Sequence, residues 1–108
     1  MADFSEETIE AVWRKAVVQA NNSPDKFRKD YAGAWIKRNE YGNRKSEYGW
    51  EIDHLKPVVK GGTDDISNLC PLNWHNNDSK DDDFPVWKTT YSSEGTKNIE
   101  LEQNWQIG

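Results

Sequence analysis

The sequence has very little cysteine and no long hydrophobic run, and each absence excludes a class of protein. Cys70 is the single cysteine among 108 residues, which excludes an internal disulfide and a zinc knuckle built from paired cysteines. No stretch approaches the roughly 20 apolar residues of a membrane-spanning helix. The first ten residues are polar and acidic, unlike a secretory signal peptide. We therefore expect a cytoplasmic protein, and a bacterial or phage cytoplasm fits this composition.

Repeats and low-complexity tracts are also absent, and the apolar fraction is only 34% against 31% charged residues. A chain this polar would be disordered if it also had few aromatic residues. It has instead 6 Trp, 4 Tyr and 3 Phe, and large aromatic side chains dominate the cores in which they are buried. We therefore expect one domain over residues 1–108, with Trp35, Trp50, Trp74 and Trp87 in its core.

An excess of basic charge is missing as well, because the formal net charge is −5. This argues against a plain nucleic-acid-binding protein. The charge is unevenly distributed, however. Residues 26–60 contain nine Lys and Arg against five Asp and Glu, whereas residues 61–108 contain three Lys against nine acids. A basic middle followed by an acidic tail is one interpretation, and ordinary solvated surface charge is the other.

The N-terminal third of the chain has the pattern of helices. Ser5 is a good N-cap, and the two glutamates that follow favour the positive end of a helix dipole. Apolar residues then recur at helical spacing, and the helix is expected to stop near Ala20, before a breaker cluster at residues 21–24. A second short helix is predicted over residues 25–31, with Pro24 suited to its first position.

Alternation, turn residues and capping predict the elements in the rest of the chain. They are strands over residues 34–38 and 48–54, a short extended segment over 69–72, a helix over 73–82, and strands over 88–91 and 98–102 that pair as a hairpin.

One segment in the middle of the chain contains the side chains best suited to chemistry. Asp53 is a hard oxygen ligand for Mg²⁺ or Mn²⁺, and its neighbour His54 can take a proton from water. Adjacent side chains on a strand point to opposite faces, so a shared site requires the strand to end or twist at this pair. On the following helix Asn73, Asn77 and Lys80 share one face, which presents two amide oxygens and one cation. Asn73 is the weaker candidate of the two amides, and we expect it to be the N-cap of the helix.

The same segment resembles the signature of HNH endonucleases. That signature consists of an Asp-His dyad, a proline, a Gly-Gly loop, an Asn-Leu pair and a helix ending in Asn-x-x-Lys. All parts occur here in the same order and spacing. They are Asp53-His54, Pro57, Gly61-Gly62, Asn68-Leu69 and the stretch Asn77-Asp78-Ser79-Lys80.

The resemblance implies a role for each of five residues. His54 would be the general base that activates water, and Asp53 and Asn77 would hold one divalent metal ion. Mg²⁺ is the expected ion, with Mn²⁺, Ni²⁺ or Zn²⁺ as alternatives. Asn68 would fix the loop between the two strands by bonding backbone groups and would thereby orient His54. Lys80 would contact a phosphate.

The expected fold is a small α+β domain with a ββα-metal core at residues 48–82, an N-terminal helix and a C-terminal strand pair. The expected partner is nucleic acid, DNA rather than RNA, and the chain is expected to act as a monomer or weak homodimer. Six basic residues either line a DNA groove or form only a solvated face. They are Arg28, Lys29, Lys37, Arg38, Arg44 and Lys45.

Two other functions stay open beside the nuclease. The first is a non-catalytic HNH-like module of phage or mobile-element origin that binds DNA or protein, which the acidic tail favours. The second is a toxin nuclease domain held by a separate inhibitor protein. Family members commonly have glycine after the final lysine, whereas this chain has Asp81-Asp82-Asp83. Three acids beside a phosphate site would repel DNA unless they face away or bind metal.

Overall fold

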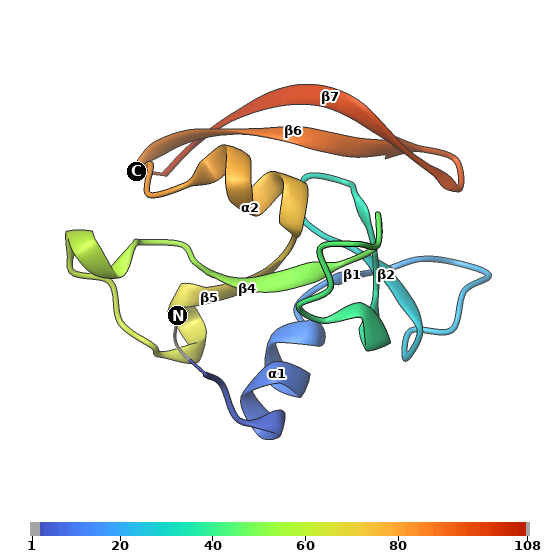
Figure 1. The fold of residues 1–108 in the computed structure, drawn as a ribbon, viewed down its shortest axis with the longest axis horizontal. Helices are drawn as coiled ribbons and strands as arrows, with labels where there is room; N and C mark the ends of the chain where they lie inside the picture. The colour runs from blue at the N-terminus through green and yellow to red at the C-terminus, as the bar shows by residue number, and fades with distance from the viewer. Residues whose placement is uncertain (1–2, 108) are drawn as a thin grey trace.

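The computed structural model describes residues 3–107, which form an α+β domain (Figure 1). The α+β class, the N-terminal helix and the C-terminal strand pair predicted from the sequence are confirmed. The helices are α1 (Glu6–Trp13) and α2 (Trp74–Lys80), and the strands are β1 (Val17–Val18), β2 (Phe27–Lys29), β3 (Trp35–Lys37), β4 (Trp50–His54), β5 (Leu69–Asn73), β6 (Val86–Glu94) and β7 (Lys97–Gln106), with short 3-10 segments η1 (Arg38–Glu40), η2 (Val58–Lys60) and η3 (Ile66–Asn68).

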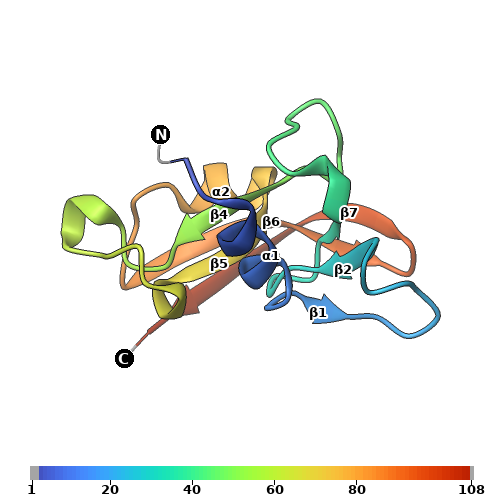
Figure 2. The same cartoon turned by 90° about the horizontal axis from the view of Figure 1, so that it is seen from below.

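The strands of residues 3–107 form three antiparallel sheets, with the orders β1–β2–β3, β4–β5 and β6–β7. Helix α2 lies between the β4–β5 hairpin and the long β6–β7 ribbon (Figure 1). Helix α1 packs against the other side of the hairpin, as the turned view shows (Figure 2). The hairpin is therefore held between two helices, and β4, β5 and α2 together have the expected ββα arrangement.

A cluster of buried apolar side chains joins α1 to the hairpin. The rings of Trp13 and Trp50 meet at its centre, with centroids 5.3 Å apart. Trp35, Trp50 and Trp87 are buried as predicted, whereas Trp74 is only partly buried. The cluster fixes β4 from one side and leaves its other side to α2. Its members are Ile9, Val12, Trp13, Ala16, Ile36, Trp50, Ile52 and Leu69.

The first helix is shorter than predicted. Ser5 caps it as expected, but α1 ends at Trp13 rather than near Ala20. The guanidinium of Arg28 donates to carbonyl oxygens just beyond this end. The next apolar pair, Val17–Val18, forms β1 and pairs with β2. The prediction of a helix to Ala20 is wrong because these contacts outweigh the local helical periodicity.

The second predicted helix, over residues 25–31, is also wrong. Its centre is β2, the middle strand of a sheet. The ring of Phe27 meets those of Trp35 and Tyr48 edge-on, at centroid distances of 6.3 and 5.7 Å. Such aromatic pairs stabilise a strand position, and they come from residues distant in the sequence.

The other predicted elements are confirmed with changed ends. Asn73 is the N-cap of α2, because its side chain accepts from the His75 N–H at 3.0 Å. The C-terminal hairpin is longer than predicted and turns at Gly95, whose φ of 60° is one that glycine adopts freely. No helix within residues 3–107 is long and apolar enough to cross a membrane.

A buried carboxylate fixes where α2 begins. Asp30 is 1% exposed, and its Oδ2 accepts from the Asn73 N–H at 2.9 Å and from Asn76 Nδ2 at 3.0 Å. Its Oδ1 accepts from the N–H groups of Ala32 and Ala34. Burial raises the pKa of Asp30 to about 6, although these donors favour the ionised form. Asp30 thus ties α2 to the chain before β3.

Candidate active site

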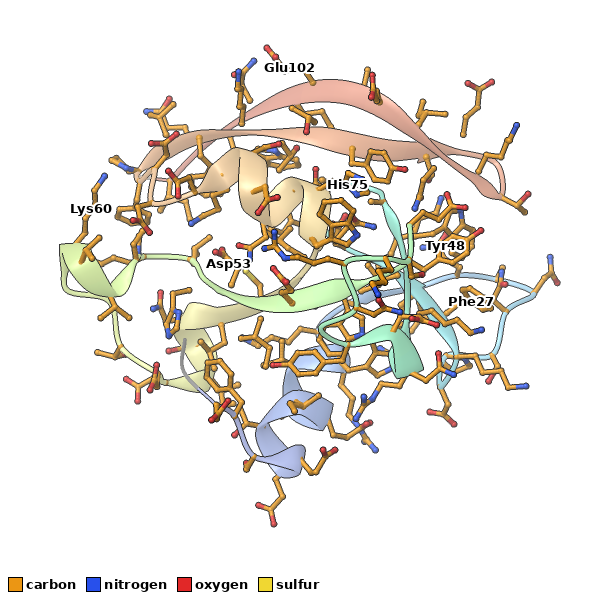
Figure 3. The ribbon with its side chains drawn as sticks, viewed as in Figure 1. Phe27, Tyr48, Asp53, Lys60, His75 and Glu102 are labelled. Atoms are coloured by element: carbon orange, nitrogen blue, oxygen red, sulfur yellow. The ribbon has the colours of Figure 1, made fainter. Side chains whose placement is uncertain are left out.

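The Asp-His dyad lies where β4 ends, as a shared site requires. His54 is the last residue of β4, and Asp53 pairs in register with Cys70 of β5. Helix α2 runs alongside β4, with Lys80 of its last turn beside Asp53, and Figure 3 shows Asp53 between β4 and α2. Asp53, His54 and Asn77 of α2 line one pocket with a volume of about 420 Å³. The fold therefore brings together three of the residues singled out by the motif.

Asp53 is nearly enclosed and faces a buried cation. Only 7% of its side chain is exposed, and Lys80 Nζ lies 3.3 Å from its Oδ2. Burial raises the pKa of Asp53 to about 6, because the cost of desolvating the carboxylate exceeds the attraction of Lys80. No hydrogen bond from residues 3–107 reaches its Oδ1. That oxygen is available to a ligand in the pocket.

Lys80 does not lie where a phosphate contact was expected. Its side chain is 0% exposed, its Nζ donates to the His54 carbonyl at 3.2 Å, and it lies 5.3 Å from the centroid of the Trp87 ring. A buried ammonium in an ion pair is not free to meet a phosphate at the surface. Lys80 instead supports the dyad from beneath, by balancing the charge of Asp53 and holding the backbone of His54.

The amide of Asn77 is oriented by Glu51, a residue that the motif did not single out. Asn77 Nδ2 donates to Glu51 Oε1 at 2.8 Å. The amide oxygen is therefore left for the pocket that Asn77 lines. Glu51 and Asp53 are two positions apart on β4 and share the face covered by α2. Strand alternation is the sequence signal that could have found Glu51.

Arg44 completes this network. Its guanidinium donates to both carboxylate oxygens of Glu51, each at 2.8 Å, and to both of Asp78 at 2.8 and 3.0 Å. Burial opposes the ionisation of Glu51, but the hydrogen bonds from Arg44 and Asn77 outweigh it and lower the pKa of Glu51. Arg44, expected to contact nucleic acid, is thus engaged by two carboxylates.

The imidazole of His54 is held by the loop that follows β4. Its Nε2 lies 2.6 Å from Asp64 Oδ1, and the ring of Phe4 lies 5.9 Å away between centroids. No hydrogen bond from residues 3–107 reaches the other ring nitrogen, Nδ1. One nitrogen therefore has a carboxylate partner, and the other is unoccupied by protein groups.

Asn68 makes the backbone hydrogen bonds that the resemblance implies. Its Oδ1 accepts from the Lys56 N–H at 2.9 Å, and its Nδ2 donates to the carbonyls of Lys56 and Thr63 at 3.0 and 2.8 Å. The loop is tight at Gly62, where a Cβ would fall 1.7 Å from the Lys56 oxygen. The effect of Asn68 on catalysis stays a prediction.

Oxygen donors for a hard cation are present but few. Asp53 offers a carboxylate oxygen and Asn77 an amide oxygen. Residues 3–107 contain no group of three or more His, Cys, Asp or Glu side chains arranged to hold a metal ion. Mg²⁺ tolerates such a site, because it retains several waters and binds through one or two carboxylates together with substrate phosphates. The donor set therefore fits one sparsely coordinated divalent ion.

Acidic residues form part of the pocket rim. Asp78, Asp81 and Asp82 line it, so the run that follows α2 does not face away from the site. Acids of one sign in a concave site attract cations and repel a phosphate that arrives alone. Arg44 also lines the pocket and pairs with Asp78, so one protein cation lies among these acids.

The other predicted nucleic-acid contacts lie apart from this pocket. Lys37 and Arg38 line a separate hollow of about 420 Å³. Lys37 Nζ lies 5.5 Å from the centroid of the Phe27 ring, and Arg38 Nε lies 3.1 Å from a carboxylate oxygen of Glu10. Lys45 is exposed in the turn beside Arg44. None of these three basic residues lines the pocket that contains the dyad.

A β-hairpin followed by a helix, with Asp, His and Asn side chains on one pocket, defines a site of the ββα class. Residues 39–83 match the model of the family described as HNH endonuclease. The resemblance found in the motif is thereby confirmed, and the matched segment contains β4, β5 and α2. Searches of curated proteins and of solved structures gave no significant match.

Proposed function

We propose that this protein is a metal-dependent endonuclease that hydrolyses phosphodiester bonds in nucleic acid and nicks DNA. The observation that carries the proposal is the convergence of Asp53, His54 and Asn77 on one pocket, within a segment that matches the HNH endonuclease family. Each of the three supplies a different group, namely a carboxylate, an imidazole and an amide.

The residues divide the work between binding and proton transfer. Asp53 Oδ1 and the amide oxygen of Asn77 would hold one divalent ion, with Mg²⁺ the expected species. When bound, such an ion stabilises negative charge at the phosphate and on the leaving oxygen. His54 takes the proton from the attacking water. Lys80 and Glu51 keep the two ligands in place.

Nucleic acid is expected to reach the site from the basic part of the chain. Lys37, Arg38 and Lys45 stand outside the acidic pocket and supply the positive charge that attracts a phosphate backbone. Lys80 and Arg44 are not among these contacts, because carboxylates of the site already pair with them. Arg38 is paired as well, with Glu10 outside the site, so Lys37 and Lys45 are the contacts without a carboxylate partner among those described. The proposal therefore separates residues that attract DNA from residues that cut it.

The proposal is tested with supercoiled plasmid and purified protein in Mg²⁺, Mn²⁺ or Ni²⁺, with a chelator as the blank. Relaxed circles are expected with a divalent ion and none with the chelator. D53A and N77A are expected to lose binding of Mn²⁺, measured by electron paramagnetic resonance, whereas D83A is the matched control outside the pocket. An unchanged Mn²⁺ titration in both variants would remove these residues from the metal site.

A non-catalytic binding module is the second candidate, and the acidic rim favours it. Asp78, Asp81 and Asp82 lower the affinity of the pocket for a bare phosphate. Binding of DNA without cutting in any of the three metals would support this candidate over the nuclease.

A further inference from the structure

We propose that Asp64 is a positioning residue that fixes His54 as its Nε2–H tautomer and leaves Nδ1 to receive the proton of the attacking water. This inference rests on the proposed function, because it assigns a partner to the proposed base. The contact that carries it joins His54 Nε2 to Asp64 Oδ1 at 2.6 Å. It is the one hydrogen bond that residues 3–107 make to this imidazole.

The direction of this hydrogen bond determines the state of the ring. A carboxylate accepts hydrogen bonds and donates none, so the shared proton belongs to Nε2. A neutral imidazole then has its lone pair on Nδ1. When water gives its proton to Nδ1, the O–H bond breaks and its electron pair stays on the hydroxide that attacks phosphorus. The ring becomes an imidazolium. Its Nε2–H still donates its hydrogen bond to Asp64, and the Asp64 carboxylate stabilises its positive charge.

The loop that presents Asp64 is fixed by neighbours already described. Asn68 Nδ2 donates to the carbonyl of Thr63, the residue before Asp64, at 2.8 Å. Gly62 lets the chain pass so close to Lys56 that a side chain would not fit. Asp64 itself is 69% exposed, so this support of the loop, rather than burial, holds its carboxylate at the ring. Asn68 thereby acts on His54 through Asp64.

The second histidine of the chain provides an internal contrast. His75 Nδ1 lies 2.9 Å from Asn73 Oδ1. The Asn73 amide is oriented by its Nδ2, which donates to the carbonyls of Trp35 and Glu47, so its Oδ1 is an acceptor. His75 is therefore held as the Nδ1–H tautomer, the reverse of His54. The chain has two histidines, and the structure predicts opposite tautomers for them.

The tautomers are measured by long-range proton–nitrogen NMR on metal-free protein, at a pH well above that at which imidazoles titrate. The signals are assigned with H75Q. His54 is expected to show a protonated Nε2, and His75 a protonated Nδ1. In D64A the chemical shifts of the two ring nitrogens of His54 are expected to change toward those of a mixture of tautomers, while the chemical shifts of His75 stay the same. A protonated Nδ1 at His54, or the same His54 pattern in D64A and wild type, overturns the proposal.

The consequence for catalysis is measured as plasmid nicking at saturating metal. D64A is expected to nick at least about tenfold more slowly, a part of the 10²–10⁴ that general acid–base catalysis contributes. D64N keeps an acceptor oxygen and is expected to recover part of the rate. D65N removes a charge from the same loop without touching His54 and is the matched control. Equal rates in D64A and D65N overturn the proposal. Failure of the wild type to nick contradicts the proposed function instead, and the tautomer measurement still tests the contact.

Discussion

At the scale of single residues, Lys80 shows how a motif residue can have a role other than the one its charge suggests. Its ammonium is buried against Asp53 Oδ2 and the His54 carbonyl, so it contacts both members of the dyad. The charge of Lys80 was evident from the sequence, but its partner was not. The sequence pattern is the same whether the lysine lies at the exposed end of a helix or beneath a strand, so the pattern alone does not distinguish the two positions.

Removal of this cation tests the buried pair. K80M keeps most of the side-chain volume but leaves Asp53 without a counter-ion, and breaking a buried pair in this way costs about 3–5 kcal/mol. The free energy of unfolding, measured in urea, is expected to fall by that amount. K88M is the matched control, because Lys88 pairs with Glu102 at the surface, where a pair contributes less than about 1 kcal/mol. Equal losses in both variants would contradict this role of Lys80.

Asp53 also predicts how metal affinity depends on pH. Its pKa is raised to about 6, and a metal ion binds the deprotonated carboxylate. As pH falls below about 6, protons occupy Asp53 and the apparent affinity for Mn²⁺ is expected to fall by up to about tenfold per pH unit. Above that pH, Asp53 is already deprotonated and causes no further change in the apparent affinity for Mn²⁺. Calorimetric titrations from neutral to mildly acidic pH measure this, and an affinity that is level across pH 6 would exclude Asp53 as a ligand.

At the scale of elements, the site depends on how α2 sits on β4. The contact between them is polar: Glu51 of β4 accepts from Asn77 of α2, and Asp78 is tied to Glu51 through Arg44. Asp30 anchors the start of α2. The orientation of Asn77 is thus set by the packing of two elements rather than by the motif alone.

Removal of Glu51 is expected to weaken metal binding indirectly, because Glu51 orients the Asn77 amide. Partners that orient a metal ligand typically change affinity by about 10–100-fold when removed, so E51A is expected to weaken Mn²⁺ binding by that factor. E100A removes an exposed glutamate from β7 and serves as the control for charge alone. Binding is measured by electron paramagnetic resonance.

A double variant separates orientation of Asn77 from simple electrostatics. In N77D the new carboxylate can present either oxygen to the metal, so it needs no partner to orient it. E51A is therefore expected to have no weakening effect in the N77D background. The same loss of affinity in both backgrounds would mean that Glu51 acts only through its charge.

The elements that the sequence predicted well are those specified by local chemistry. Asn73 caps α2, and the Asp-His pair ends β4, as expected. The errors lie between residues 14 and 31, where helical periodicity suggested helices. There the pairing of Phe27–Lys29 with β1 and β3 decides the structure. Likewise, no local pattern brings Asp64 to His54, because a loop fixed by Asn68 makes that contact.

At the scale of the whole molecule, Arg44 lines the acidic pocket, whereas the other predicted nucleic-acid contacts do not. Asp78, Asp81 and Asp82 line the pocket, and Lys37 and Arg38 line another hollow. The overall charge of −5 therefore does not describe the local charge of the pocket or of the other hollow. A single ββα site acts on one strand, so the protein is expected to convert supercoiled plasmid to open circles, with linear product only after a second encounter or with two protomers.

The role of His54 is tested most directly by the rate of plasmid nicking by H54A at saturating metal, measured beside the wild type. H54A keeps Asp53 and Asn77 and is expected to bind Mn²⁺ as the wild type does. Its nicking rate is expected to fall by about 10²–10⁴, the contribution of a general base. A rate equal to that of the wild type, with the metal bound, would contradict the assignment of His54 and with it the proposed site.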